Sequence, residues 1–309
     1  MLAITFLGTS AARPTVERNV SSISVTRDGE TFMFDCGEGT QRQMMRYGVG
    51  FSLRDIFFTH FHADHMLGVT GLVRTLGLQG RTDPICLYGP VGAKDILSQA
   101  MLLGVERTPF EIHIEEIKPG DRLERGEYEI RVFATQHTRH SIGFIIAEHE
   151  RLGRFNPEKA RELGIPEGPL WGQIHAGKTV TLDDGRKIGP EELVGETRPG
   201  RKVVLSGDTR PCKSVVDAAE DADLLIHEAT FGEEEEDRAE ETGHSTAKGA
   251  AQVALAARAR RLVLSHLSAR YSKDFHPLLE QARAVFPNTV VARDGMSIEV
   301  PFPDAAAEG

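Results

Sequence analysis

The chain has 309 residues, of which 40% are hydrophobic and 27% charged, and this balance excludes a chain that is disordered throughout. The 46 acidic residues outnumber the 36 Lys and Arg, and the formal net charge of −10 argues against a protein that is held on nucleic acid by a uniformly basic surface. Three widely spaced cysteines without a CxxC motif argue against a disulfide framework and against a thiolate zinc site.

The N-terminal segment is apolar, but it is too short for a secretory signal with a cleavage site, and no basic stretch precedes it. No run of about 18 apolar residues, the length of a membrane span, occurs along the chain. We therefore expect no membrane partner and a cytoplasmic location.

Strand and helix patterns are mixed along the whole chain. Asp28-Gly29 lies between two apolar runs, which is a strong signal for a β-hairpin. We predict strands at 2–8, 20–34 (as that hairpin), 56–58, 85–88, 129–134, 142–147, 202–206, 223–227, 261–265 and 289–299. We predict helices from residue 40 and at 67–79, 93–103, 212–220, 245–259 and 276–286. The predicted fold class is therefore α/β, with two mixed sheets packed face to face and helices outside.

Residues 151–202 differ in composition from the rest of the chain. They contain nine glycines and five prolines, and their ten Lys or Arg against eight acids give a local charge of +2, which leaves −12 for the remainder. A short helix over 157–163 and a hairpin over 179–188 are predicted within them. We interpret 151–202 as a flexible arm inserted in a single domain that spans 1–309; a surface loop without a role is the alternative.

The strongest chemical signal is the sequence HFHADH at residues 60–65, directly after a short apolar strand. His60 and His62 are two residues apart, so on an extended chain their side chains point to the same side. Asp64 and His65 follow where the chain turns into a helix. Imidazole and carboxylate groups at this density are the ligands that zinc and similar metals prefer, so the pattern HxHxDH predicts a metal site.

Three further predicted strands end on potential ligands, at Asp208, at His266 and in the stretch from His137 to His140. Ligands at the exits of separate buried strands can converge on one cleft, and HxHxDH alone cannot complete two coordination spheres. A single His or Asp at the end of a strand is more often a cap or a surface residue. The agreement of several such positions favours the metal interpretation.

Short motifs along almost the full length of the chain have a recognisable pattern. They are FLGT at 6–9, FDCGEGTQ at 34–41, THFHADH at 59–65, LYGP at 87–90, SGDTRPC at 206–212, HEATF at 227–231 and GHST at 243–246. Together they resemble the ribonuclease Z family (tRNase Z, short form) of the metallo-β-lactamase superfamily. HxHxDH indicates only the superfamily, whereas GDTRPC, HEAT and HST are specific to this family. The resemblance implies the αβ/βα sandwich of that superfamily, and it makes the arm, which contains Gly168-Pro169, a tRNA-binding exosite.

Position by position, the resemblance implies a dinuclear metal centre with two Zn²⁺ per subunit as cofactors, although His/Asp sites also accept Mn²⁺ or other divalent ions. His137 is preferred over His140 because it stands six residues before Gly143-Phe144, as the family's ligand does. The implied metal ligands are His60, His62 and His137 for the first metal, Asp64, His65 and His266 for the second, and Asp208 as the bridge.

The resemblance also implies catalytic roles. Asp64 resembles the family's proton acceptor, and Glu228 and His244 resemble a pair that assists the departing oxygen. Alternatively, Glu228 could orient a metal ligand and His244 could cap the following helix. In the N-terminal loop, Val16 stands where the family often has a Lys that is associated with reading the tRNA 3′ end. The resemblance therefore leaves the exact cleavage position and the treatment of a CCA end open.

The implied function is that of a metal-dependent phosphodiesterase, an endonuclease that removes 3′ trailers from tRNA precursors and leaves a 3′-hydroxyl on the tRNA and a 5′-phosphate on the trailer. The implied partners are precursor tRNA and a second copy of the chain, because in this family the arm of one subunit serves the active site of the other. Two alternatives stay open: a related hydrolase of small esters or thioesters, which needs no arm, and a non-catalytic RNA-binding scaffold, in which metal ligands usually decay. The acidic net charge then limits where RNA can bind instead of excluding it.

Overall fold

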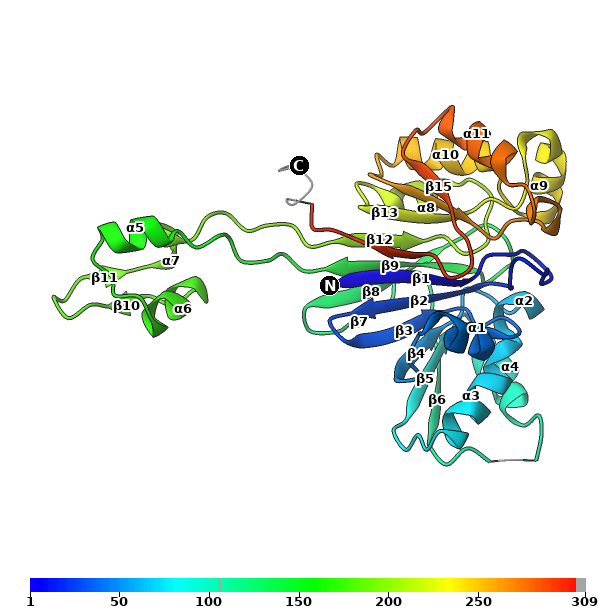
Figure 1. Cartoon of the computed structure of the whole chain (residues 1–309), viewed down its shortest axis with the longest axis horizontal. Helices are drawn as coiled ribbons and strands as arrows, with labels where there is room; N and C mark the ends of the chain where they lie inside the picture. Colours follow the sequence, from blue (N-terminus) through cyan, green and yellow to red (C-terminus); the bar gives the residue numbers. More distant parts are fainter. Residues whose placement is uncertain (106, 304–309) are drawn as a thin grey trace. The chain divides into compact units, whose positions relative to one another are not determined.

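Two mixed β-sheets, each of seven strands, form the framework of the chain (Figure 1). The computed structural model describes residues 1–105 and 107–303. Except for Glu148, the last residue of the second sheet's strand that precedes the second unit, both sheets belong to a first unit, which consists of Met1–Ala147 and Lys202–Pro301. Glu148–Arg201 and the described residues after Pro301 form a second unit.

The first sheet has the strand order β16-β1-β2-β3-β4-β5-β6. Pairing is antiparallel from β16 to β3 and parallel from β3 to β6. Its strands are β1 (Leu2–Gly8), β2 (Ser22–Arg27), β3 (Glu30–Phe34), β4 (Leu53–Phe57), β5 (Ile85–Gly89), β6 (Ile112–Glu116) and β16 (Ser297–Glu299). Helices on its outer side bury apolar side chains against it (Figure 1), and they are α1 (Thr40–Tyr47), α3 (Gly68–Leu78) and α4 (Ala93–Met101).

The second sheet has the order β15-β14-β13-β12-β9-β8-β7, and β12 to β15 are parallel. Its strands are β7 (Arg122–Glu124), β8 (Tyr128–Ala134), β9 (Ile142–Glu148), β12 (Lys202–Leu205), β13 (Leu224–Glu228), β14 (Leu262–Ser265) and β15 (Thr289–Val291). Its outer side is covered by α8 (Lys213–Ala219), α10 (Ala247–Ala256) and α11 (His276–Arg283), with α9 (Glu236–Thr242) before α10. Among the helices in 1–105 and 107–303, every one is too short or too polar to traverse a lipid bilayer.

The hairpin predicted at Asp28-Gly29 is confirmed. Both residues have positive φ, 46° and 92°, which a two-residue turn of type I′ requires. Arg27 and Glu30 flank the turn as the last pair of the β2–β3 ladder.

The prediction of one continuous strand over 289–299 is wrong. The segment forms β15 and β16, which belong to different sheets: β15 pairs with β14 in the second sheet and β16 with β1 in the first. Between them Gly295 has a φ of 83°, a left-handed conformation that ends the extended run and that glycine adopts without strain. The segment therefore carries the chain from one sheet to the other.

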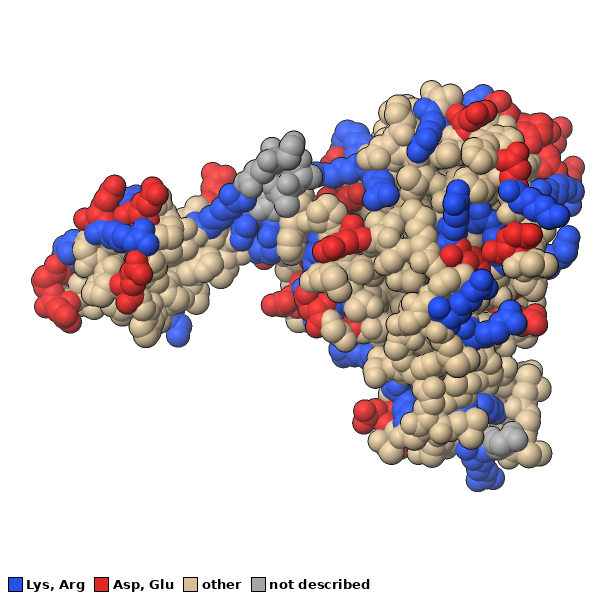
Figure 2. Space-filling view, in the orientation of Figure 1, with Lys and Arg blue, Asp and Glu red and all other residues tan. Residues whose placement is uncertain are grey.

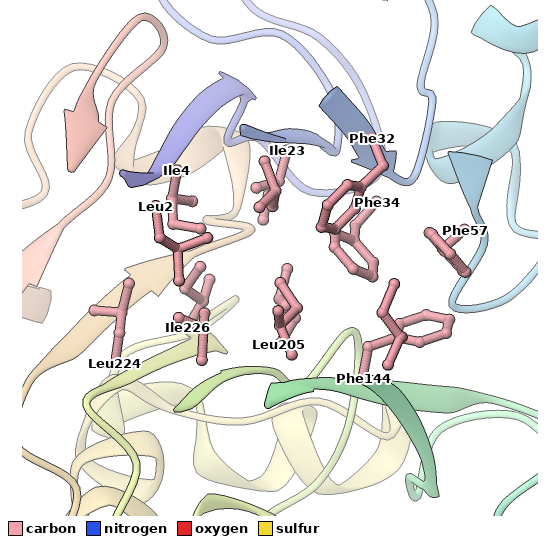
Figure 3. Close-up of a cluster of buried hydrophobic side chains, with 14 of the residues drawn as sticks. Leu2, Ile4, Ile23, Phe32, Phe34, Phe57, Phe144, Leu205, Leu224 and Ile226 are labelled. Carbon is pink, nitrogen blue, oxygen red and sulfur yellow. The ribbon is translucent and has the colours of Figure 1, made fainter. Parts of the chain in front are cut away.

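The two sheets pack face to face through large apolar side chains (Figure 3). Phe34 and Phe57 of the first sheet stack with ring centroids 5.2 Å apart. Phe144 of β9 lies 5.1 Å from Phe34 and 5.6 Å from Phe57, so one ring of the second sheet joins two of the first. Because protein interiors are closely packed, these contacts fix how the sheets, and hence the strand ends, are placed.

The second unit has a hydrophobic core of its own, to which each of its elements contributes. The helix predicted over 157–163 and the hairpin predicted over 179–188 are present, and two further short helices were not predicted. Asn156 caps the first helix by accepting a hydrogen bond from the backbone N of Lys159 at 3.0 Å. The elements are α5 (Pro157–Glu162), α6 (Pro169–His175), β10 (Val180–Thr181), β11 (Lys187–Ile188) and α7 (Pro190–Leu193).

Replacing Phe144 with Ala should lower the free energy of unfolding by about 3–5 kcal/mol, because it leaves a cavity between the sheets. Urea or thermal unfolding followed by circular dichroism measures this loss. Leu102, which is 79% exposed, provides the matched control: Leu102→Ala should change the stability by less than about 0.5 kcal/mol. Equal effects of the two substitutions would contradict the role of Phe144 in joining the sheets.

Candidate metal centre

The HxHxDH cluster lies where β4 leaves the first sheet. The extended chain after β4 carries His60 and His62, and the short helix α2 (Ala63–Met66) begins directly after His62. His60 Nε2 and His62 Nδ1 lie 2.9 Å apart, so both imidazoles face the same side, as the spacing predicts. The helix brings in Asp64 and His65, whose Oδ2 and Nε2 atoms are 3.5 Å apart.

Three strands of the second sheet deliver ligand groups to the same place, since His137 follows β8, Asp208 follows β12 and His266 follows β14. Asp208 Oδ2 lies 3.6 Å from His60 Nε2 and 3.7 Å from His137 Nε2. His266 Nε2 lies 3.3 Å from Asp64 Oδ2. The ligand atoms fall into two groups, and within each group they all lie within 4.8 Å of one another. The first group is His60, His62, His137 and Asp208; the second is Asp64, His65 and His266. The structure thus brings all seven sequence-predicted ligands together.

This geometry distinguishes between the two candidate ligands His137 and His140. His137 Nε2 lies 3.1 Å from His62 Nδ1, inside the cluster. His140 is exposed, and in the described part of the chain it belongs to no group of ligand atoms that could hold a metal.

Hydrogen bonds to the far ring nitrogens orient the imidazoles. His137 Nδ1 lies 2.9 Å from the carbonyl oxygen of Gly243, and His266 Nδ1 lies 3.1 Å from Thr230 Oγ1. Such partners fix the tautomer and the ring orientation of metal-binding histidines and leave the other ring nitrogen for the metal. The donor set and its surroundings therefore fit a divalent cation of the borderline class.

Asp35 belongs to the site, although the sequence analysis did not single it out. Its Oδ2 lies 2.7 Å from His65 Nδ1, and its Oδ1 accepts a hydrogen bond from the backbone N of Thr59 at 2.8 Å. The carboxylate is buried. Its position at the end of an apolar strand, within FDCGEGTQ, is the same signal that identified Asp208, but nothing local indicates that it contacts an imidazole thirty residues away.

Burial and neighbouring charges shift the proton affinities of the cluster. Burial, reinforced by the charge of His65, holds the pKa of His60 well below its usual value. Burial acts in the same direction on His65, but the carboxylates of Asp208 and Asp35 outweigh it and raise the pKa of His65 well above its usual value. Burial opposes ionisation of Asp208, yet the charges of His266 and His65 hold the pKa of that carboxyl well below its usual range. A metal ion that binds here therefore competes with protons.

Glu228 and His244 form a hydrogen-bonded pair beside the cluster. Glu228 ends β13, and its Oε1 lies 2.7 Å from His244 Nδ1. Burial opposes the charged imidazole, but the Glu228 carboxylate raises the pKa of His244 to about 9. The second oxygen of Glu228 accepts a hydrogen bond from Thr230 Oγ1 at 2.7 Å, and Thr230 in turn contacts His266. Glu228 can thus orient His244 and support a ligand partner at the same time.

The alternative that His244 caps the following helix is wrong. Thr246 is the N-cap of α10, and its Oγ1 accepts a hydrogen bond from the backbone N of Gly249 at 3.0 Å. The His244 side chain faces Glu228 instead, so it is available for chemistry.

A cleft of about 390 Å³ opens on the cluster. The loop that carries Val16 reaches this cleft through Ala12, whose backbone N donates a hydrogen bond to Asp64 Oδ2 at 2.7 Å. Val16 itself is 95% exposed and does not line the cleft. The polar and charged residues of the lining include Arg13, Asp64, Asp208, Arg238, His244 and Arg270.

Comparisons with known proteins bear on the identity of this site. A family model described as "Anti-Pycsar protein Apyc1" matches residues 2–154, and one described as "Beta-lactamase superfamily domain" matches residues 193–267. A ribonuclease Z of Gemmatimonas aurantiaca is 59% identical over 309 residues, which cover 99% of this chain and 98% of the relative. The chain belongs to the ribonuclease Z family.

Further members of the ribonuclease Z family agree. A ribonuclease Z of Haloferax volcanii is 50% identical over 307 residues, covering 99% of this chain and 97% of the relative. The crystal structure of human tRNase Z, short form, matches with a TM-score of 0.71 at 29% identity and covers 97% of this chain and 100% of that chain. The predicted family and the predicted sandwich fold are confirmed, and the fold together with the donor set indicates the use of divalent metal.

Asp35→Asn should weaken metal binding by about 10–100-fold, because the imidazole of His65 loses its charged partner. Isothermal titration of the metal-free protein with Zn²⁺ measures the affinity. Asp217→Asn, which alters an exposed carboxylate on α8, is the control and should bind like the unmodified protein. Unchanged affinity in Asp35→Asn would exclude an orienting role for Asp35.

Proposed function

We propose that this member of the ribonuclease Z family is a dinuclear metal-dependent endoribonuclease that cleaves 3′ trailers from tRNA precursors. The products are a tRNA with a 3′-hydroxyl and a trailer with a 5′-phosphate. The observation that carries the proposal is the convergence of seven His and Asp side chains on one cleft, in a chain 59% identical to a ribonuclease Z over nearly its full length.

Two Zn²⁺ per subunit are the proposed cofactors, with Mn²⁺ or other divalent ions as possible substitutes. When bound, such ions supply Lewis-acid polarisation of the phosphodiester and a hydrolytic nucleophile near neutral pH. His60, His62 and His137 are proposed to hold one ion. Asp64, His65 and His266 are proposed to hold the other, and Asp208 to contact both.

The protein's own groups move the protons. Asp64, oriented by the backbone N of Ala12, accepts the proton released by the attacking water. His244, held protonated by Glu228, donates a proton to the departing 3′-oxygen of the tRNA. The proposal thus needs a protonated His244 as the acid and an ionised Asp64 as the base, and the surroundings of each group favour that state. Burial opposes ionisation of Asp64, but the hydrogen bond with His266 and the charges of neighbouring imidazoles together outweigh it and lower the pKa of this carboxyl below its ordinary value.

The second unit is proposed to be the tRNA-binding arm. Its exposed Lys side chains, interspersed with acidic ones over its surface (Figure 2), include Lys159, Lys178 and Lys187. Lys contacts with phosphates supply affinity without reading sequence. A substrate as small as a single phosphodiester has no need of such contacts.

We also infer a homodimer in which the arm of one subunit serves the active site of the other. The support for this inference is the family resemblance together with the separate core of the arm unit, which makes it a self-contained module.

Incubation of the metal-loaded protein with a 3′-extended tRNA precursor should yield the products named above, and sequencing of the product ends measures them and the cleavage position. Asp64→Ala should lower kcat at least about 100-fold because it removes the proton acceptor, while the precursor still binds in a gel-shift assay. Asp217→Ala should cleave normally. Persistent cleavage by Asp64→Ala would contradict the catalytic assignment.

The triple substitution Lys159→Gln, Lys178→Gln and Lys187→Gln should raise KM for precursor tRNA about tenfold or more, since three phosphate contacts are lost. Hydrolysis of bis(p-nitrophenyl) phosphate, a single phosphodiester that needs no contact with the arm, should be unaffected. The matched control replaces Lys94, Lys118 and Lys213 of the first unit with Gln. Equal loss of both activities in the arm variant would argue against this division of labour.

Mixing the arm variant with Asp64→Ala tests the dimer. If the arm acts on the partner, a mixed dimer combines the intact arm of one subunit with the intact site of the other and recovers activity. If the mixture is no more active than the two separate variants, the inferred exchange of arms is wrong.

A further inference from the structure

Two openings adjoin the metal centre. One is the cleft described above, which is lined by His244 and Arg270. The other, here termed the hollow, has a volume of about 270 Å³ and is lined by His60, Phe61, His62, Val91, Arg139 and His140 among others. His62 lines both openings, so both border the same candidate ligand.

The proposed chemistry assigns the cleft to the tRNA body. His244 lines the cleft, and the oxygen that it protonates belongs to the 3′ end of the tRNA. After cleavage the phosphate stays on the trailer, so the trailer extends from the metal centre away from the tRNA end. An RNA chain that crosses the centre therefore needs a second space for the nucleotides beyond the scissile phosphate.

We propose that the hollow binds the first nucleotides of the 3′ trailer. This inference deepens the proposed function and rests on it. Arg139 contacts the phosphate between the first and the second trailer nucleotide, and Phe61 provides a surface for the first base. His140, which is absent from the ligand cluster, lies in the same hollow and can donate a hydrogen bond to the trailer backbone.

The charge of the hollow suits a polyanion. Among the described residues, its lining contains Arg139 and three histidines but no Asp or Glu, whereas the lining of the cleft includes the carboxylates of Asp64 and Asp208. In the cleft, Arg238 and Arg270 already pair with Glu235. Arg139 is exposed and, within residues 1–105 and 107–303, has no carboxylate at ion-pair distance. Its guanidinium is thus available to a phosphate, which it can bind in bidentate fashion.

The shape of the hollow suits an unpaired nucleotide. Phe61 is partly exposed and Val91 is 51% exposed, so an aromatic ring and an aliphatic side chain face the opening. Bases of single-stranded RNA stack on such aromatic groups regardless of sequence, which fits trailers of varied sequence. The volume lies just below the ~300 Å³ at which small-molecule pockets begin, so it is sufficient for about one nucleotide and too small for duplex RNA.

The test compares tRNA precursors whose trailers contain one, two or several nucleotides, because only trailers of two or more have the phosphate that Arg139 contacts. For the unmodified holoenzyme, kcat/KM should rise about tenfold from one to two nucleotides and little thereafter, as expected for one charge-assisted contact. Arg139→Gln should lose this rise, and the slope of log KM against log salt should fall by about 0.7, as for one phosphate contact on a single strand.

Arg139→Lys keeps the charge and should retain most of the rise, which separates loss of a contact from loss of folding. Arg107→Gln, in which an exposed Arg that lines neither opening is changed, should behave like the unmodified protein. A trailer-length dependence in Arg139→Gln equal to that of the unmodified protein would overturn the inference. Failure of the unmodified protein to cleave any precursor would instead overturn the proposed function.

Discussion

The buried carboxylate of Asp208 is the group on which the metal centre depends. It is only 3% exposed, and burying a carboxylate is unfavourable unless opposite charge and hydrogen bonds replace the lost water. Four imidazoles lie within 3.7 Å of its oxygens, those of His60, His65, His137 and His266. Because His60 and His65 follow a strand of the first sheet, on the extended chain and on α2, and His137 and His266 follow strands of the second, the compensation exists only when the two sheets are held in one relative position.

The sandwich core holds that position. The rings of Phe34, Phe57 and Phe144 join the sheets near the strands that lead to the site, and the segment between β15 and β16 links the sheets through the chain itself. At the exit of β12, Gly207 approaches so closely that a Cβ atom there would lie 2.9 Å from Thr59 Cβ, and its φ is 61°. A glycine directly before Asp208 therefore lets the two strand exits meet.

Charge is divided between the parts of the molecule in a way that reconciles an acidic chain with an RNA substrate. In the metal centre Asp208 is buried and Asp64 half-buried, both beside imidazoles, and as metal ligands they would face cations and not phosphate. The acidic run around Glu235 pairs with Arg238 and Arg270 beside the cleft. The exposed cations that we propose for phosphate contact lie on the second unit and at Arg139 in the hollow, and the net charge of −10 describes neither place.

The sequence by itself determined the fold class, most strands and helices and four of the seven proposed ligands, because strand alternation, the Asp-Gly turn and HxHxDH are local patterns. The motif resemblance along the chain supplied the family and the other three proposed ligands, His137, Asp208 and His266. The tertiary structure agrees with the choice of His137 over His140, and it alone decided that Asp35 and Thr230 orient imidazoles and that residues 289–299 divide between two sheets. Charged, half-exposed strands such as β6 and β7 also escaped prediction because their apolar pattern is weak. The orientation of the imidazoles and the division of residues 289–299 depend on contacts between residues far apart in the chain, which no local spacing encodes.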